Sequence, residues 1–371
     1  MKKIFVSAIV TSCAFLLPIQ AIAGVAAATD PCSDKVVTPQ SSSKSATVTA
    51  GMISSRIANV SSGFVSSNGA TNSPTLNVAA PSTCGAATPV PTLALGETET
   101  HTEKTVPGDM ARSSSSAHGV WSSASTNMVK KTDPNGYYSG DIHNIVVGYD
   151  TRLTPDLIGG IAFGYEIVDI RTHYNTGKVD ASAWTIAPYL GYQINDWLMA
   201  DVAIGRTSVN YKHRRSTIIE GKTSAVRWFG SANISATQKV DNFILTGTLG
   251  YLALNEEQEA YTETNNATVD KQLTNFGQAR ATLKAAYPIK TANSIFIPNG
   301  FARFEYDANH EEGTTLSGNV VSTTDPTGVV LGLGADYIIN NNVTLNITGT
   351  TTQLRENLKS HGISATARFN F

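Results

Sequence analysis

The strongest constraint on the fold is an alternation of apolar and polar residues that recurs between residues 118 and 371. Successive side chains of a β-strand point to opposite faces of a sheet, so this pattern predicts strands with one apolar and one polar face. The clearest examples are residues 157–169, 182–194, 279–289 and 329–339. The second part of the chain is therefore predicted to be all-β.

The alternation continues to the last residue. Ile363, Ala365, Ala367, Phe369 and Phe371 share one face of the final strand, and the residues between them include Ser, Thr, Arg and Asn. An unpaired strand edge invites pairing with other chains, so this strand needs a partner. Either the core of a sandwich or the wall of a closed transmembrane barrel would provide one.

The connections between these strands alternate between short and long. The short ones are 153–156, 195–196, 241–242, 290–293 and 340–342, and the long polar ones are 175–180, 213–222, 256–271 and 308–325. A transmembrane barrel has short turns at one rim and long loops at the other. The charged residues that flank the long loops are expected to be solvated; they are His213, Arg214, Arg215, Glu256 and Glu257.

By these criteria about eleven segments between Ile142 and Phe371 are strands. Closed bacterial barrels have an even number of strands, so one more strand is expected. The segment that best provides it is His118 to Lys131, around Trp121. The predicted fold of residues 118–371 is a transmembrane antiparallel up-and-down β-barrel of about 12 strands.

Charge and aromatic placement favour the barrel over the sandwich. The predicted lumenal charges, which share the polar phase of their strands, are Glu166, Arg280, Lys284, Arg303, Glu305 and Arg368. The aromatic residues expected at one water–lipid boundary are Trp197, Phe243, Tyr287, Tyr337, Phe369 and Phe371. The lumenal charges are expected to form ion pairs, and the alternative is a role in gating or in contact with a translocating chain.

Residues 1–23 are predicted to be a secretory signal peptide. Met1-Lys2-Lys3 precedes an apolar run at 4–17, and Ala21-Ile22-Ala23 matches the small-residue cleavage pattern. The run is shorter than the roughly 20 residues that a membrane-spanning helix needs. A lipoprotein site at Cys13 is the less favoured alternative, because the apolar run continues past this cysteine.

Residues 24–117 form a low-complexity arm, rich in Ser, Thr, Ala, Pro and Gly, that reads as a short passenger-like or linker region. Such a composition cannot bury enough apolar surface to offset the entropy of ordering. One short amphipathic helix is predicted at residues 47–65, where Met52, Ile53 and Ile57 have helical spacing. This helix could pack locally in the arm or lie in the lumen of the barrel.

Cys32 and Cys84 are the cysteines that remain after the signal peptide, and they could pair in an oxidising compartment. Such a bridge would stabilise the protein by about 4 kcal/mol. Neither has a CxxC neighbour, so no metal site is expected at these cysteines. No cofactor is expected either. The net charge of −2 argues against a nucleic-acid partner. The arm has neither G-D-S-L nor G-x-S-x-G, so no catalytic residues are expected and the chain is predicted not to be an enzyme.

Several sequence features resemble the autotransporter β-domain family. Residues 147–165, VGYDTRLTPDLIGGIAFGY, resemble the strand–turn–strand core of that domain. Residues 189–192, Trp197 and 203–205 resemble the strands that follow it, and Trp121 and Phe371 match the ends of the domain. The resemblance covers roughly residues 118–371.

The resemblance implies a translocator of type V secretion in the outer membrane of a Gram-negative bacterium. It also implies an N-terminal passenger outside the cell and a helix in the pore just before the first strand. Phe369 and Phe371 resemble the signal that the barrel-assembly machinery reads. The implied partners are outer-membrane lipid, that machinery and periplasmic chaperones, and the barrel is expected to be a monomer.

The chain departs from the family pattern before the barrel. The arm is short and lacks β-helix repeats, and residues 93–117 contain Pro107 and Gly108, which make a poor pore helix. The Asn pairs at 265–266 and 340–342 lie in predicted connections, so autocleavage at an Asn pair inside the pore is not expected.

Three functions remain open at this point. The first is an autotransporter-type barrel that anchors its own short N-terminal segment and displays it at the cell surface. The second is a stand-alone barrel, structural or weakly channel-forming, whose arm is periplasmic or plugs the lumen. The third is a barrel that acts through its long loops as an adhesin or a membrane enzyme.

Overall fold

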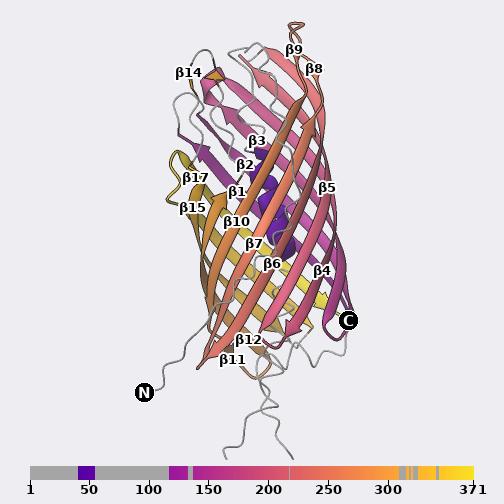
Figure 1. The fold of residues 1–371 in the computed structure, drawn as a ribbon, viewed down its shortest axis with the longest axis vertical. Helices are drawn as coiled ribbons and strands as arrows, with labels where there is room; N and C mark the ends of the chain where they lie inside the picture. Colours follow the sequence, from indigo (N-terminus) through magenta and orange to yellow (C-terminus); the bar gives the residue numbers. More distant parts are fainter. Residues whose placement is uncertain are drawn as a thin grey trace, which may run out of the picture.

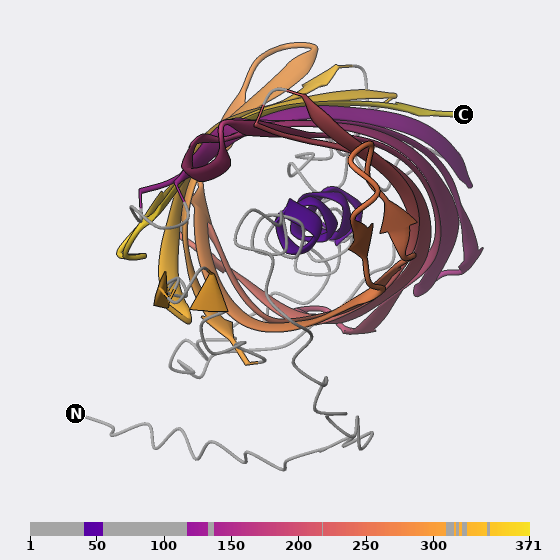
Figure 2. The same ribbon diagram turned by 90° about the horizontal axis from the view of Figure 1, so that it is seen from above.

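The computed structural model describes residues 41–54, 117–132, 137–216, 218–308, 315–316, 319–320, 325–339 and 342–371. The predicted signal peptide, most of the arm, Cys32 and Cys84 therefore lie outside the described residues. Figure 1 shows a tall barrel of tilted strands, and Figure 2 shows a helix inside the ring.

Twelve antiparallel strands close into a barrel, as predicted. They are β1 (His118–Lys131), β2 (Tyr138–Thr154), β3 (Leu157–Thr172), β4 (Gly177–Asn195), β5 (Leu198–Arg215), β6 (Ile219–Val240), β7 (Phe243–Gln258), β10 (Gln272–Ala286), β12 (Ser294–Asp307), β15 (Thr327–Ile339), β16 (Val343–Gln353) and β17 (Leu358–Asn370). The two-residue strand β11 (Ile289–Lys290) also pairs with β12 and continues the line of β10. Pro288 lies in the gap between β10 and β11, where its lack of an N–H group interrupts the ladder.

The wall has its apolar face outside. Side chains alternate between exposed and buried along most of the wall, as in β1 with the pattern eBeBiBeBiBeBeB. Large apolar residues point outward, among them Trp184 (65% exposed), Ile204 (60%) and Leu333 (77%). Among the described residues, no helix has both the length and the apolar character that a membrane crossing requires.

The two rims of the barrel differ. Short turns at one rim, here called the short-turn rim, join β2 to β3, β4 to β5 and β6 to β7. The other rim, here called the long-loop rim, carries the short helix η2 (His173–Asn175) and the small hairpins β8 (Tyr261–Thr262) with β9 (Thr268–Val269) and β13 (Thr315–Leu316) with β14 (Asn319–Val320). The aromatic residues predicted for one boundary lie on the outer wall toward the short-turn rim; they are Trp197, Phe243, Tyr287, Tyr337, Phe369 and Phe371.

The barrel closes where β1 pairs with β17, from Gly119 opposite Asn370 to Lys131 opposite Leu358. An ion pair crosses over β1 at this seam, because Arg368 Nη1 lies 3.0 Å from Asp150 Oδ1 on β2. A Cβ on Gly119 would lie 2.4 Å from the Arg368 guanidinium, so a larger residue at this position would require the arginine side chain to move.

Trp121 and Tyr189 extend this network on the inner wall. The Trp121 indole Nε1 donates to the Tyr189 hydroxyl at 2.8 Å, and that hydroxyl donates to Asp150 Oδ2 at 3.1 Å. The indole lies against Gly148, where a Cβ would come within 2.3 Å of the ring. The network joins strands β17, β2, β1 and β4 near the short-turn rim.

Two sequence-based expectations need correction. The described helix covers residues 41–54, so it begins six residues before the predicted start at 47; the predicted residues 55–65 lie outside the described part of the chain. The second correction concerns the flanks of the long loops, where β5 continues to Arg215 and β7 to Gln258. As a result His213, Arg215 and Glu256 are buried rather than solvated.

Candidate functional site

The candidate site is the lumen, where the helix of residues 41–54, here called the lumenal helix, packs against β2–β7 (Figure 2). A buried ion cluster holds one face of this helix. The Arg227 guanidinium lies between two carboxylates, with Nε 2.7 Å from Glu256 Oε2 and Nη1 3.4 Å from Glu166 Oε1. Ser42 donates to Glu256 at 2.8 Å, and Ser45 donates to Glu166 while it accepts from Arg227 Nη1 at 2.7 Å.

Tyr211 completes this cluster. Its hydroxyl donates to Glu256 Oε1 at 2.9 Å and lies 3.0 Å from the hydroxyl of Ser42. The three charged side chains are at most 4% exposed. A buried charge is costly unless it is paired and hydrogen-bonded, and here the helix itself supplies part of the hydrogen bonding.

Small apolar residues on the same helix face fill the space below the cluster. Ala46, Ala50 and Ile53 are at most 1% exposed and recur at helical spacing. They pack into an inward-facing apolar cluster of the wall that contains Trp121, Val146, Ala162, Phe229 and Leu252. Ser, Ala and Gly are small, so the helix approaches the strands closely, although Ser and Gly have modest helix propensity.

The helix has a defined direction in the lumen. Near its first residues, Ser42 contacts Tyr211 and Glu256, which lie toward the ends of β5 and β7 at the long-loop rim. At its last described residue, Ser54 accepts from Asn233 Nδ2 at 3.0 Å, and Asn233 also donates to Asp201, near the start of β5 at the short-turn rim. The N-terminal end of the helix therefore faces the long-loop rim.

The opposite face of the helix borders an open part of the lumen. A cavity of about 310 Å³ separates this face from β10, β12, β15 and β16. Lys44, Val48 and Gly51 line it from the helix side. A Cβ added at Gly51 would meet no atom of the described residues within 4 Å.

The predicted lumenal charges lie in three separate groups. Glu166 belongs to the buried cluster with Arg227, and Arg368 lies at the seam. Arg280, Lys284 and Arg303 line the cavity. Glu305 lies beside them, 3.0 Å from Arg303 Nε.

Sequence reasoning missed the central ion of the buried cluster. Arg227 is followed by Trp228, which is 51% exposed on the outer wall, and the strand period then places Arg227 inside. Glu256 has the same phase as the buried Leu252 and Leu254. Both residues could have been found by extending the alternation of β6 and β7 to the ends of these strands.

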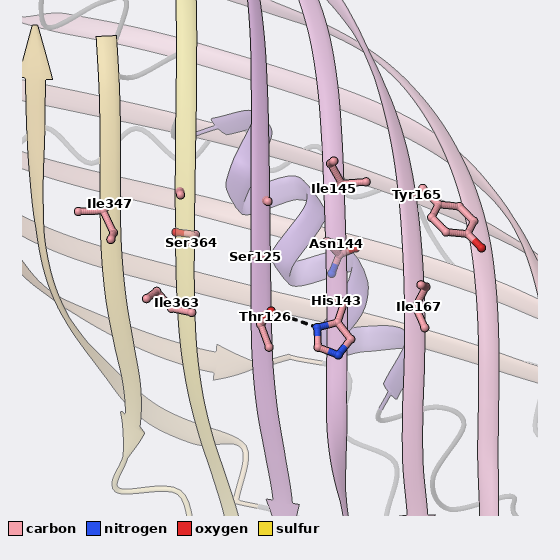
Figure 3. A pocket seen from close by; sticks show the side chains of 12 residues that line it. Ser125, Thr126, His143, Asn144, Ile145, Tyr165, Ile167, Ile347, Ile363 and Ser364 are labelled. Carbon is pink, nitrogen blue, oxygen red and sulfur yellow. Dashed lines mark hydrogen bonds between the residues drawn. The ribbon is translucent and has the colours of Figure 1, made fainter.

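A second hollow lies on the outer wall, over β1, β2, β3, β16 and β17 (Figure 3), with a volume of about 370 Å³. It forms because the small pair Ala124 and Ala365 stands between the larger side chains of Ile145 and Ile347. It belongs to the apolar outer face and is separate from the lumen. In the described part of the chain, no group of three or more His, Cys, Asp or Glu side chains could hold a metal ion.

The family model described as the autotransporter β-domain matches residues 120–350. The chain belongs to the autotransporter β-domain family. The barrel is accordingly an outer-membrane barrel of the type found in type V secretion. The match of the family model confirms the resemblance read from residues 147–165 and from the chain end. A search of curated proteins found no match.

Solved structures support the same fold. The translocator domain of the autotransporter NalP from Neisseria meningitidis has a TM-score of 0.59 at 15% identity, over 69% of this chain and 89% of that one. The β-domain of the Bordetella autotransporter Brka has a TM-score of 0.59 at 13% identity, over 69% of this chain and 100% of that one. The transport unit of the autotransporter AIDA-I from Escherichia coli has a TM-score of 0.59 at 13% identity, over 68% of this chain and 90% of that one.

Proposed function

We propose that this autotransporter-type barrel anchors itself in the outer membrane and displays its own N-terminal segment at the cell surface, without an enzymatic activity. The observation that carries the proposal is the direction of the lumenal helix. Because its N-terminal end faces the long-loop rim, the residues that precede the helix are attached on that side. In an outer-membrane barrel the long loops are on the extracellular side.

The start of the wall supports the same route. His118 and Gly119 pair with Thr151 and Asp150, next to the short turn between β2 and β3. The helix thus runs from the long-loop rim toward the short-turn rim, and β1 starts its way back from the short-turn rim. This arrangement would leave the segment before residue 41 outside and the barrel in the membrane.

Other parts of the proposal concern export and assembly. We propose that residues 1–23 are removed as a signal peptide, that residues 24–117 serve as passenger and linker, and that Cys32 pairs with Cys84. We further propose that Phe369 and Phe371, both exposed on the outer wall, are read by the barrel-assembly machinery, with periplasmic chaperones as earlier partners. A monomer is expected, since closure of the wall leaves no free strand edge.

Protease shaving of intact cells tests the display. An epitope tag is inserted after Ala28, so that Lys35 provides a trypsin site between the tag and the lumenal helix. If the segment is displayed, trypsin treatment of intact cells separates the tag from the barrel on a reducing gel, where a Cys32–Cys84 bridge no longer joins the two pieces, while the barrel stays intact.

Two matched tags make the result decisive. The same tag at Asn265, on the long-loop rim, should be accessible in intact cells, and the same tag at Asn242, in the short turn between β6 and β7, should become accessible only after permeabilisation. A tag at Ala28 that behaves like the one at Asn242 would overturn the proposal. The chain would then be a barrel with a periplasmic arm or a plug.

A further inference from the structure

The open side of the lumen, counting both the wall and the helix, carries more positive than negative charge. Among the described residues, four cations lie close enough to interact there with two carboxylates. The cations are Lys44, Arg280, Arg303 and Arg355, and the carboxylates are Glu305 and Asp307. The excess of two positive charges contrasts with the cluster on the packed side, where one cation lies between two carboxylates.

The two carboxylates are already engaged by Arg355 and Arg303. Arg355 Nη1 lies 2.5 Å from Asp307 Oδ2, and its Nη2 lies 3.7 Å from Glu305 Oε2. Arg303 Nε lies 3.0 Å from Glu305 Oε1. Two of the four cations therefore take up most of the available negative charge.

Lys44 and Arg280 are left with little compensation. Arg280 Nε donates to the neutral amide of Gln278 at 2.9 Å, and its buried Nη2 has no hydrogen-bond partner in the described part of the chain. Lys44 interacts with Glu305, but it shares that carboxylate with three arginines. A cation in a partly dehydrated lumen favours a nearby counter-charge.

The cavity gives a small anion access to these cations. Lys44, Arg280 and Arg303 all line it, and the rest of the lining is rich in hydroxyl groups that can donate hydrogen bonds, such as those of Thr282 and Thr350. Lys284, a fourth lining cation, is balanced by Asp336 at 3.9 Å. Asp201 also lines the cavity, but it lies at the Ser54 end, about 15 Å along the helix from Lys44.

We propose that the open side of the lumen binds small inorganic anions at Lys44, Arg280 and Arg303 and forms an anion-selective passage beside the helix. Rings of Lys and Arg select anions in other pores by the same electrostatic principle. This activity goes beyond display of the N-terminal segment, and it holds whether or not that segment reaches the cell surface.

Planar lipid bilayers with the purified full-length chain test the proposal. A KCl gradient across the bilayer gives a reversal potential whose sign reports whether chloride or potassium crosses faster. We expect the sign that corresponds to faster passage of chloride. In the double variant Arg280→Gln/Arg303→Gln the ratio of chloride to potassium permeability should fall toward unity, with a further fall when Lys44→Gln is added.

The control variant Lys212→Gln/Lys271→Gln also removes two positive charges, but from side chains that are 42% and 53% exposed and paired with surface glutamates. It should keep the parent selectivity. Cation selectivity, an equal loss in the control, or the absence of conductance through the parent barrel would each overturn the proposal. Heat-modifiable electrophoretic mobility shows that each variant is folded before it is measured.

Discussion

The two sides of the lumen differ in how their inward-facing charges are compensated. On the packed side, the wall of β2–β7 buries its charges against the helix, and each polar group of the Arg227 cluster finds a partner. On the open side, the wall of β10–β16 faces a cavity and keeps an excess of cations. Among the described residues, the lumenal helix is therefore held mainly from the side of β2–β7.

Neighbouring helix residues show the difference most directly. Ala50 is completely buried against the apolar cluster of the wall, whereas a Cβ at Gly51 would have no neighbour within 4 Å in the described part of the chain. A helix held on one side can remain bound while solutes pass on the other.

The largest effect is expected from Arg227→Met. Without the guanidinium, Glu166 and Glu256 remain buried without a cation, and breaking such a pair costs about 3–5 kcal/mol. The free energy of unfolding in urea should fall by this amount, and trypsin should cut faster at Lys44 as the helix leaves the wall. Arg303→Met on the open side is the matched control. It should lower the free energy of unfolding by about 1 kcal/mol or less, because Arg355 still pairs with Glu305.

Ser45→Ala should have the next largest effect. It removes a hydroxyl that bonds both Glu166 and Arg227, and hydrogen bonds to charged groups contribute about 1.5–3 kcal/mol. A double-mutant cycle with Arg227→Met, measured by urea unfolding, should show strong coupling between the two changes. Simple additivity of the two losses would contradict a shared cluster.

Leucine substitutions at the adjacent helix positions Ala50 and Gly51 place the same side chain on the packed side and on the open side of the helix. Ala50→Leu overpacks the apolar cluster and should lower the free energy of unfolding by about 1–3 kcal/mol. Gly51→Leu should cause no such loss and should reduce the conductance of the barrel, because the added side chain fills part of the cavity. Equal destabilisation by both variants would mean that the helix is enclosed on all sides.

The smallest effect is expected from Gly51→Ala. Alanine is about 1 kcal/mol more favourable than glycine inside a helix, and the new methyl group meets no neighbour. The urea midpoint should therefore rise slightly while the conductance stays the same. A lower midpoint would show that this face of the helix is already in contact with other groups.

The strands of the wall could be predicted from sequence because each depends on a local pattern, the alternation of apolar and polar side chains, that repeats from strand to strand. Each strand alternates with a period of two, and the even-number rule assigned His118 to Lys131 as β1, which the structure confirms. Trp121 had already marked that segment as the first strand. Exposed Leu333 and Trp184 follow the same alternation.

The interior was harder to predict because its contacts join residues far apart in the chain. Ser42 and Glu256 are 214 residues apart, and nothing around Ser42 in a serine-rich tract indicates this bond. The helix position was inferred from apolar residues, but its first turns are fixed by serine hydroxyl groups. Glu256 was assigned to a loop as part of a polar stretch, whereas its pairing with Arg227, directly opposite on the neighbouring strand β6, lets β7 continue past it.

The ion pair at the seam has a consequence for the timing of assembly. Arg368 reaches over the first strand to Asp150 in the second, so the bond joins a part of the wall with a part that is made 218 residues later. During synthesis, Asp150 exists long before its counter-charge does. Closure of the cylinder at this point therefore cannot begin until β17 has been made, and a chain interrupted before β17 keeps both an open edge and an Asp150 that lacks the Arg368 guanidinium.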